Sequence, residues 1–163
     1  MTTAYINRVA TAVPQNDVHQ AFIDFATNLL PEGTSRRLFG RMARLSAIGH
    51  RYSFVNPITN EDGSWEDEEQ IYVPGNFPTT ARRMELFERF APQLAHAALD
   101  KLSLTAPERQ AITHVIVTSC TGLYAPGLDF EVVNHLGLSP SVERTMIGFM
   151  GCYAAMNALK LAP

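Results

Sequence analysis

The sequence predicts an α/β protein in which helices cover a partial, mostly parallel β-sheet. Two apolar stretches, 112–119 and 141–149, are typical of buried strands, and one helical pattern over 128–136 lies between them. Strands joined through a single helix pair in parallel with a right-handed crossover. Parallel strands need helices on both faces, and amphipathic helical patterns are frequent before residue 101. We therefore expect three layers, α, β and α.

The first elements of the chain are predicted to be a strand and a helix. Residues 5–13 have the pattern of a short strand, which Pro14 ends. Asp17 is the expected N-cap of a helix over 18–30. The apolar side chains at helical spacing in this helix are Phe22, Phe25, Ala26 and Leu29.

A second helix, strongly basic, is expected over 35–47, after a break at 31–35. Its apolar residues, which we expect to lie inside, are Leu38, Phe39, Met42 and Leu45. Its basic residues, spread over the other sides, are Arg36, Arg37, Arg41 and Arg44. The pattern predicts an amphipathic helix with a charged outer face.

The middle of the chain is predicted to be irregular and then helical. Prolines and Gly-containing turn pairs interrupt residues 56–77. The acidic run at 66–69 should be a solvated loop, because four adjacent acids in a loop cannot all converge on one metal ion. A long helix should then run from 79 or 80 to about 101, with Pro92 as a kink or break within it.

The last predicted helix begins at Gly151-Cys152 and is apolar on every side. Between 152 and 162, only Asn157 and Lys160 are strongly polar. A helix that is apolar all round must be buried on all sides. We therefore expect further protein to cover it.

The composition argues against several classes of function. The 163 residues suit one domain or one half of a larger one. A net charge of −3 favours neither nucleic acid nor an anionic membrane, and no apolar run approaches the ~20 residues of a membrane span. Two cysteines cannot make a disulfide framework and the start lacks a signal-peptide pattern, so we expect a cytoplasmic protein with free thiols. Charged residues make up only 18%, against ~25% on average, which indicates surface that more protein covers.

Cys152 is the candidate nucleophile, because it lies where a buried strand gives way to a helix. The N–H groups of a helix N-terminus stabilise an anion and so lower the pKa of a thiol. Gly148 and Gly151 leave room for a substrate close to the backbone. On position alone, a small cysteine that fills core space is the alternative. A nucleophilic cysteine would also need a base or cation partner such as histidine.

The histidines include no evident partner for this cysteine. Each lies in a predicted helix, strand or loop without a neighbouring ligand pattern. They are His19, His50, His96, His114 and His135. A zinc site would lack the short paired spacing of structural zinc motifs, so we expect none. Its ligands would have been Cys120, Cys152, His114 and His135.

Four blocks of sequence resemble the type III polyketide synthases, the chalcone synthase-like enzymes of the thiolase superfamily, and the bacterial members more than the plant ones. The blocks are Thr113–Gly122, Ala125–Asp129, Leu136–Val142 and Gly151-Cys152, and upstream Arg37–Met42 and His50–Tyr52 agree with the same family. The resemblance implies a thiolase-like, layered α-β-α fold. Residues 1–163 would be its N-terminal domain, one repeat with a partial, mostly parallel sheet, and the C-terminal domain would be absent from the chain.

The resemblance also implies a reaction. Cys152 matches the nucleophile that takes an acyl group from a coenzyme A thioester, which malonyl units then extend by decarboxylative Claisen condensation. The enzyme thioester keeps the acyl carbon electrophilic for the next carbanion. Loss of carbon dioxide supplies that carbanion, so neither an organic cofactor nor a metal is implied. The expected partners are acyl-CoA, malonyl-CoA and, in the full-length form, a second copy in a homodimer.

Further residues match family positions with a role in binding or assembly. Cys120 and Thr121 match the lining of the active-site cavity. Arg41 matches a basic residue that contacts the phosphates of coenzyme A, a task that suits a planar guanidinium. Ala125-Pro126-Gly127 match a loop that reaches into the partner subunit, often with a cis peptide before the proline.

The chain also departs from the family pattern. Ala125 replaces a common methionine, and Leu38 and Leu45 replace lysines, whose place Arg37 or Arg44 would have to take. The family's catalytic His and Asn and its gatekeeping Phe belong to the second half of the polypeptide. We therefore expect little or no condensation by the isolated chain. Two alternatives stay open: a ketoacyl-carrier-protein synthase III-like enzyme, and a non-catalytic chain that binds a full-length homologue.

Overall fold

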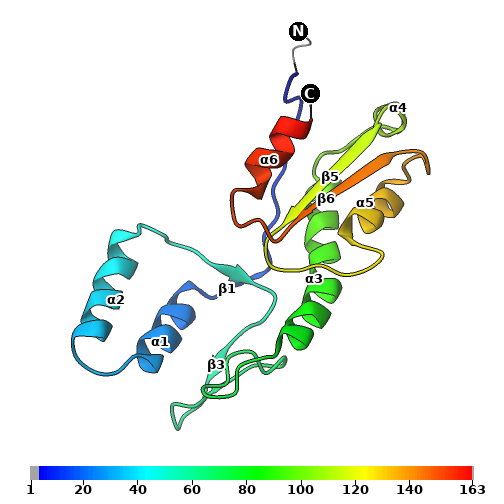
Figure 1. The fold of residues 1–163 in the computed structure, drawn as a ribbon. Coiled ribbons are helices and arrows are strands. Elements are labelled where there is room, and N and C mark those ends of the chain that lie inside the picture. The colour runs from blue at the N-terminus through cyan, green and yellow to red at the C-terminus, as the bar shows by residue number, and fades with distance from the viewer. Residues whose placement is uncertain (1–3, 163) are drawn as a thin grey trace. The chain divides into compact units, whose positions relative to one another are not determined.

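The computed structural model describes residues 4–162, which form two compact units (Figure 1). We call residues 4–12 and 80–162 the sheet unit, and residues 13–79 the helix-pair unit. Each unit has buried apolar side chains of its own, so each is described by itself.

The sheet unit is built on one βαβ motif. Its elements are β5 (His114–Ser119), α5 (Leu128–Leu136) and β6 (Glu143–Gly148). The two strands are parallel and pair residue for residue, and the last pair is Ser119 with Gly148. Gly137 ends α5 in the left-handed conformation, with φ 61°, which is a common way to stop a helix. The predicted strands, helix and parallel pairing are confirmed.

The core of the sheet unit lies between the strands and α5. Its buried side chains are Val115, Val132, Val133, Leu138 and Val142. α3 (Thr80–Asp100) packs against α5, and its Ala95 and Leu99 border this core. α3 keeps Pro92 in its interior and runs as one helix over the predicted range. Helical cover on this face of the strand pair is therefore complete enough to bury five side chains.

α6 (Ala154–Leu161) lies on the other side of the strand pair from α5 in Figure 1. Ala154 is 3% exposed and anchors the helix, which contacts both strands. Met156 and Leu159 remain 60% and 55% exposed. The expected apolar helix is present, and nothing among residues 4–162 covers its outer face. Within the same range, none of the helices is both long and apolar enough to cross a bilayer.

The predicted strand over residues 5–13 is wrong. The described part of this segment has no ladder hydrogen bonds, and Val9 is 79% exposed. A strand needs a neighbour that accepts and donates backbone hydrogen bonds, and no described strand takes that place. The segment is held by side chains instead: the Arg8 guanidinium pairs with Glu108 of α4 (Ala106–Gln110), a short helix that the sequence pattern did not predict.

The helix-pair unit contains the two predicted helices, α1 (His19–Leu29) and α2 (Thr34–Leu45). It also contains two short strands that the sequence did not predict, β1 (Asn16–Asp17) and β2 (Tyr52–Ser53), which pair antiparallel. Asp17 is not the N-cap of α1, because that position falls to Val18. From one residue earlier, the Asp17 carboxylate still accepts the N–H of His19, at 3.1 Å. Asp17 thus satisfies one free donor of the first turn.

The predicted burial of the apolar face of α2 is wrong. Leu38, Met42 and Leu45 are 55%, 60% and 72% exposed, and no residue of α2 is buried. α1 packs against α2, but the three sheets of the described chain are all two-stranded and the helix-pair unit contains only two-residue strands. One short helix cannot cover the whole apolar stripe of another, so the stripe stays open.

The core of the helix-pair unit is aromatic. Phe25 of α1 meets the rings of Trp65 and Tyr72 edge-on, with 5.4 Å between ring centroids in each pair. Trp65 comes from a small hairpin in the region predicted to be irregular, formed by β3 (Ile58–Thr59) and β4 (Trp65–Glu66). Phe25 and Trp65 are both more than nine-tenths buried.

The acidic run at 66–69 is not uniformly solvated, which corrects the prediction. Asp67 is only 8% exposed, and its carboxylate accepts backbone N–H groups of Glu69, Ile71 and Tyr72. A buried N–H without a partner is costly, and the Asp67 carboxylate accepts each of these three donors. Asp67 therefore organises the loop from inside, while Glu66 and Glu68 face solvent.

Candidate functional site

The carboxyl ends of β5 and β6 bring the two cysteines of the chain together. Cys120 follows β5 directly, and Cys152 follows β6 after a loop of three residues. Their Sγ atoms lie 4.0 Å apart, and both thiols are free. Because the strands are parallel and in register, their carboxyl ends meet at one edge. The candidate nucleophile and a predicted cavity residue thus share that edge.

A tight turn sets the position of Cys120. The Ser119 hydroxyl accepts the backbone N–H groups of Thr121 and Gly122, at 3.4 and 3.3 Å. Gly122 is buried against Phe87 of α3, and a Cβ atom on Gly122 would overlap that ring. The chain therefore turns sharply after Cys120 and leaves Thr121 exposed at the edge of the site.

The loop before Cys152 uses two residues with left-handed backbone. Phe149 has φ 53° and Gly151 has φ 94°, and the Phe149 N–H donates to the Ser119 carbonyl at 3.0 Å. Cys152 lies in the turn before α6, whose N-cap is Tyr153 and whose first helical residue is Ala154. The predicted position at a strand-to-helix junction is confirmed, but the helix begins two residues later than expected.

The two thiols interact with each other electrostatically. The hydrogen bond with Cys152 raises the pKa of the Cys120 thiol, and desolvation adds to this effect. Cys120 consequently keeps its proton at neutral pH and can present it to the neighbouring sulfur. Cys152 is the more exposed of the two.

The loop at 125–127 lies just beyond this turn. The Ala125–Pro126 peptide bond is cis, as the resemblance implied, and both residues are exposed. Gly127 has φ 112° and forms the N-cap of α5. A Cβ atom on Gly127 would overlap the Asp129 carboxylate, which is buried and bound to Arg144 at 3.0 Å. This ion pair joins the first turn of α5, directly after the loop, to β6.

The Asp129–Arg144 pair was missed in the sequence, although a signal existed. Asp129 is an acid in the first turn of a predicted helix, where the dipole favours it. Arg144 lies within a strand otherwise predicted to be buried, where an arginine needs a partner. The coincidence of the two would have indicated the contact.

No histidine of the sheet unit reaches Cys152. His114 lies at the amino end of β5, about 16–20 Å along the strand from Cys120. His135 stacks on His96 with 3.9 Å between ring centroids and bonds Asp100 at 2.6 Å, near the C-terminal end of α5. Within residues 4–162, no group of three metal-ligating side chains forms, so the zinc alternative gains no support.

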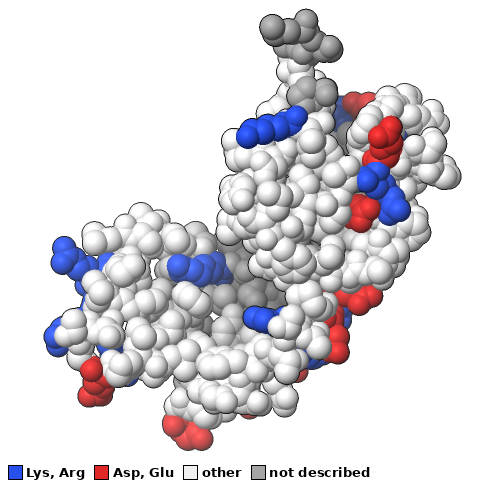
Figure 2. All heavy atoms as spheres, viewed as in Figure 1, with Lys and Arg blue, Asp and Glu red and all other residues white. Residues whose placement is uncertain are grey.

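Arg41 lies on the exposed side of α2, in the helix-pair unit. Figure 2 shows basic side chains gathered over this helix. Arg36 donates to the Leu30 carbonyl, and Arg37 to the Thr34 hydroxyl. In the described chain, the guanidinium groups of Arg41 and Arg44 have no such partner. Of the four arginines, these two are the ones available to bind an anion.

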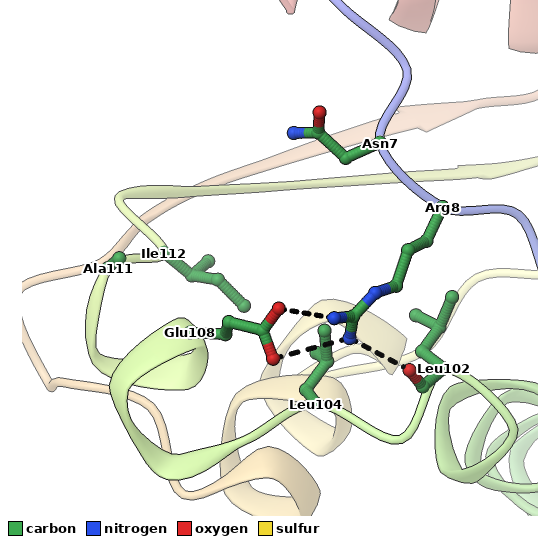
Figure 3. A pocket seen from close by; sticks show the side chains of 7 residues that line it. All are labelled: Asn7, Arg8, Leu102, Leu104, Glu108, Ala111 and Ile112. Atoms are coloured by element: carbon green, nitrogen blue, oxygen red, sulfur yellow. Dashed lines mark hydrogen bonds and ion pairs between the residues drawn. The ribbon is translucent and has the colours of Figure 1, made fainter.

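A separate cavity of about 330 Å³ lies at the far end of the strand pair (Figure 3). Its lining includes Arg8, Glu108 and Ile112. The Arg8 guanidinium donates hydrogen bonds to the Glu108 carboxylate and to the Leu102 carbonyl. Ile112 precedes the amino end of β5, so this cavity is distinct from the cysteine edge.

Comparison with known proteins places this arrangement in a family. The profile described as "Chalcone and stilbene synthases, N-terminal domain" matches residues 2–163. The α-pyrone synthesis polyketide synthase-like protein Pks18 of Mycobacterium tuberculosis is 35% identical over 99% of the chain. Bisdemethoxycurcumin synthase of Oryza sativa is 34% identical over 98%. The chain spans 39% of the length of each of these relatives.

The fold agrees with the sequence match. The crystal structure of PKS-I from the brown alga Ectocarpus siliculosus superposes with a TM-score of 0.68 and 29% identity, covering 94% of this chain and 41% of that one. The expected thiolase-like α/β fold is confirmed. The chain belongs to the chalcone and stilbene synthase family of type III polyketide synthases, and covers its N-terminal part.

Proposed function

We propose that this chain carries the acyl-accepting half of a type III polyketide synthase, an acyltransferase in which Cys152 is the nucleophile. The observation that carries the proposal is the exposed Cys152 thiol at the carboxyl edge of the parallel strand pair, beside Cys120. Ligand and active sites of open α/β sheets lie outside the carboxyl ends of the strands. Family membership supports the same assignment.

The first step is a thiol exchange. The Cys152 thiolate attacks the carbonyl carbon of an acyl-CoA, the C–S bond to coenzyme A breaks, and coenzyme A leaves as a thiolate that takes up a proton. The acyl group is then held as a thioester on Cys152. Cys120 and Thr121 would line the space around it, and Arg41 would bind the phosphates of coenzyme A. No metal or organic cofactor enters this step.

The second step is extension with malonyl-CoA. Loss of carbon dioxide leaves an enolate, whose carbon attacks the thioester carbonyl and expels the Cys152 thiolate. In the sheet unit no histidine lies at Cys152 to stabilise the negative charge that develops on the enolate and thioester oxygens in this step. We propose that the remaining part of a full-length synthase provides such a residue, in a cytoplasmic homodimer whose partner meets the exposed loop at 125–127.

Mass spectrometry of the purified chain tests the first step. After incubation of the reduced protein with acetyl-, hexanoyl- or lauroyl-CoA, we expect an acyl adduct on the tryptic peptide that contains Cys152. Cys152→Ala should abolish the adduct, whereas Cys120→Ala should retain it. A native fold by circular dichroism without any adduct would contradict the proposal and favour a chain that only binds a homologue. We expect little or no product from malonyl-CoA, and robust product formation by the chain alone would contradict the proposed division of the two steps.

A further inference from the structure

The two thiols at the carboxyl edge form a pair without a third ligand. Cys120 Sγ and Cys152 Sγ are 4.0 Å apart, close to van der Waals contact, and both cysteines are free. In the described chain no metal-binding group of three side chains includes them. Cys152 is exposed and Cys120 is partly exposed. The pair therefore has a chemistry beyond acyl transfer, which is the formation of a sulfur–sulfur bond.

We propose that Cys120 and Cys152 form a reversible disulfide when a hydroperoxide oxidises them, and that this modification masks the nucleophile. Such a bond would protect Cys152 from irreversible oxidation and would stop acyl transfer until a thiol reductant restores it. The inference goes beyond the proposed function, since it concerns the pair of sulfurs and requires no coenzyme A.

The oxidation takes place in two steps and is balanced in atoms and electrons. The Cys152 thiolate attacks a peroxide oxygen, the O–O bond breaks, and Cys152 becomes a sulfenic acid while hydroxide leaves. The Cys120 sulfur then attacks the Cys152 sulfur, the S–O bond breaks, and the Cys120 proton and the departing hydroxide form water. In total two thiols and one hydrogen peroxide give one disulfide and two waters. Two molecules of a monothiol reductant return both thiols and are themselves oxidised to a disulfide.

The backbone allows the sulfurs to meet. A disulfide needs an S–S distance near 2.05 Å, so the two sulfurs must approach by about 2 Å. Both cysteines lie in loops beyond the last ladder pair, Ser119 with Gly148. We expect side-chain rotation and a movement of the loop 149–151 to bring the sulfurs together without breaking the ladder of the strand pair.

The electrostatics assign the order of the two steps. The hydrogen bond with Cys152 raises the pKa of Cys120, so Cys120 keeps its proton until the second step. Cys152 is the more accessible sulfur and meets the oxidant first. Cys120 then acts as the resolving thiol, a role that needs proximity more than exposure.

Peptide mapping gives a direct test. The purified chain is treated with hydrogen peroxide, free thiols are blocked with N-ethylmaleimide, and the protein is digested with trypsin. Cleavage at Arg109, Arg144 and Lys160 separates the cysteines into peptides 110–144 and 145–160. We expect a single cross-linked species of these two peptides, which dithiothreitol separates. Iodoacetamide labelling of Cys152 should fall on oxidation and return on reduction.

Cys120→Ser is the matched variant, because it exchanges one sulfur for oxygen at nearly constant shape. In it, peroxide should carry Cys152 to sulfinic and sulfonic acids, so that the labelling recovered with dithiothreitol falls below about a tenth of the original. Circular dichroism confirms that the variant folds. Oxidation in guanidinium chloride is the second control, and the cross-linked yield should fall there because the fold no longer holds the sulfurs together.

The proposal is wrong if the wild-type chain and Cys120→Ser lose Cys152 labelling to the same irreversible extent. It is equally wrong if Cys120 stays open to N-ethylmaleimide in the oxidised chain, or if the unfolded chain cross-links as well as the folded one. None of these readouts uses acyl-CoA, and the acyl adduct is measured on reduced protein. Failure of the disulfide and failure of the acyl transfer are therefore separate results.

Discussion

The helices α5 and α2 both carry apolar residues at helical spacing, but only α5 buries them. α5 buries Val132 and Val133 against the strand pair and borders the core of the sheet unit. α2 buries no residue, and its Leu45 is 72% exposed. The difference lies in the neighbours of each helix. α5 connects the two strands in sequence and packs against both of them, whereas α2 packs against α1. An apolar stripe therefore predicts a helix reliably, but predicts burial only when a receiving surface lies nearby in the chain.

The aromatic cluster of the helix-pair unit should contribute far more to stability than the open stripe of α2. Phe25→Ala removes the ring that contacts Trp65 and Tyr72, and should lower the free energy of unfolding by about 3–5 kcal/mol. Leu45→Ala, on the open stripe of α2, should change it by no more than about 0.5 kcal/mol. Urea unfolding followed by the fluorescence of Trp65, the single tryptophan, measures both. Equal losses would show that α2 is packed in solution.

Gly127→Ala tests how tightly the sheet unit holds its site. The new methyl would overlap the buried Asp129 carboxylate, and the φ of 112° is strained for any residue with a Cβ atom. We expect the free energy of unfolding to fall by about 1–3 kcal/mol. Gly148→Ala is the matched control, since a Cβ there meets nothing and its φ is ordinary. Chemical denaturation by circular dichroism compares them, and a smaller loss for Gly127→Ala than for the control would contradict the packing described.

The carboxylate of Asp17, at the start of α1, should make a small pH-dependent contribution to stability. The hydrogen bond with His50, followed by backbone N–H groups of His19 and Arg51, holds the pKa of Asp17 below its usual value near 3.8. A lowered pKa means that this stabilisation is present above about pH 3.8 and is lost as the pH falls through the folded value. The urea midpoint of the wild-type chain should thus decline more steeply below pH 4 than that of Asp17→Asn. Parallel curves for the two proteins would exclude a role for this carboxylate.

The sheet unit could be predicted almost element by element. The ranges expected for β5, α5, β6 and α3 agree with the structure to within a few residues, because hydrophobic period, a Gly stop and turn residues all indicate the same boundaries. The strand at 5–13 failed for a physical reason: strand propensity is expressed only when a neighbouring strand completes the hydrogen bonds. The burial of Asp67 was not predicted, because a run of acidic residues does not show which one turns inward to accept backbone N–H groups.

The sequence proposes the members of the candidate site but not their geometry. Cys152 was proposed from its place at a strand-to-helix junction, and Cys120, Thr121 and Arg41 from the resemblance alone. The 4.0 Å between the two sulfurs depends on the register of β5 and β6, which a pattern of apolar residues does not specify.

Because the two paired strands have equal length, the number of residues after each strand determines where its thiol lies. Each strand contributes six residues to the ladder, and one further residue reaches Cys120 while four reach Cys152. A deletion in the loop 149–151 would withdraw one sulfur, and an inserted residue in either strand would turn its side chains to the opposite face. Segments exchanged between this chain and its relatives must therefore conserve residue counts from 114 to 120 and from 143 to 152, whatever else they vary.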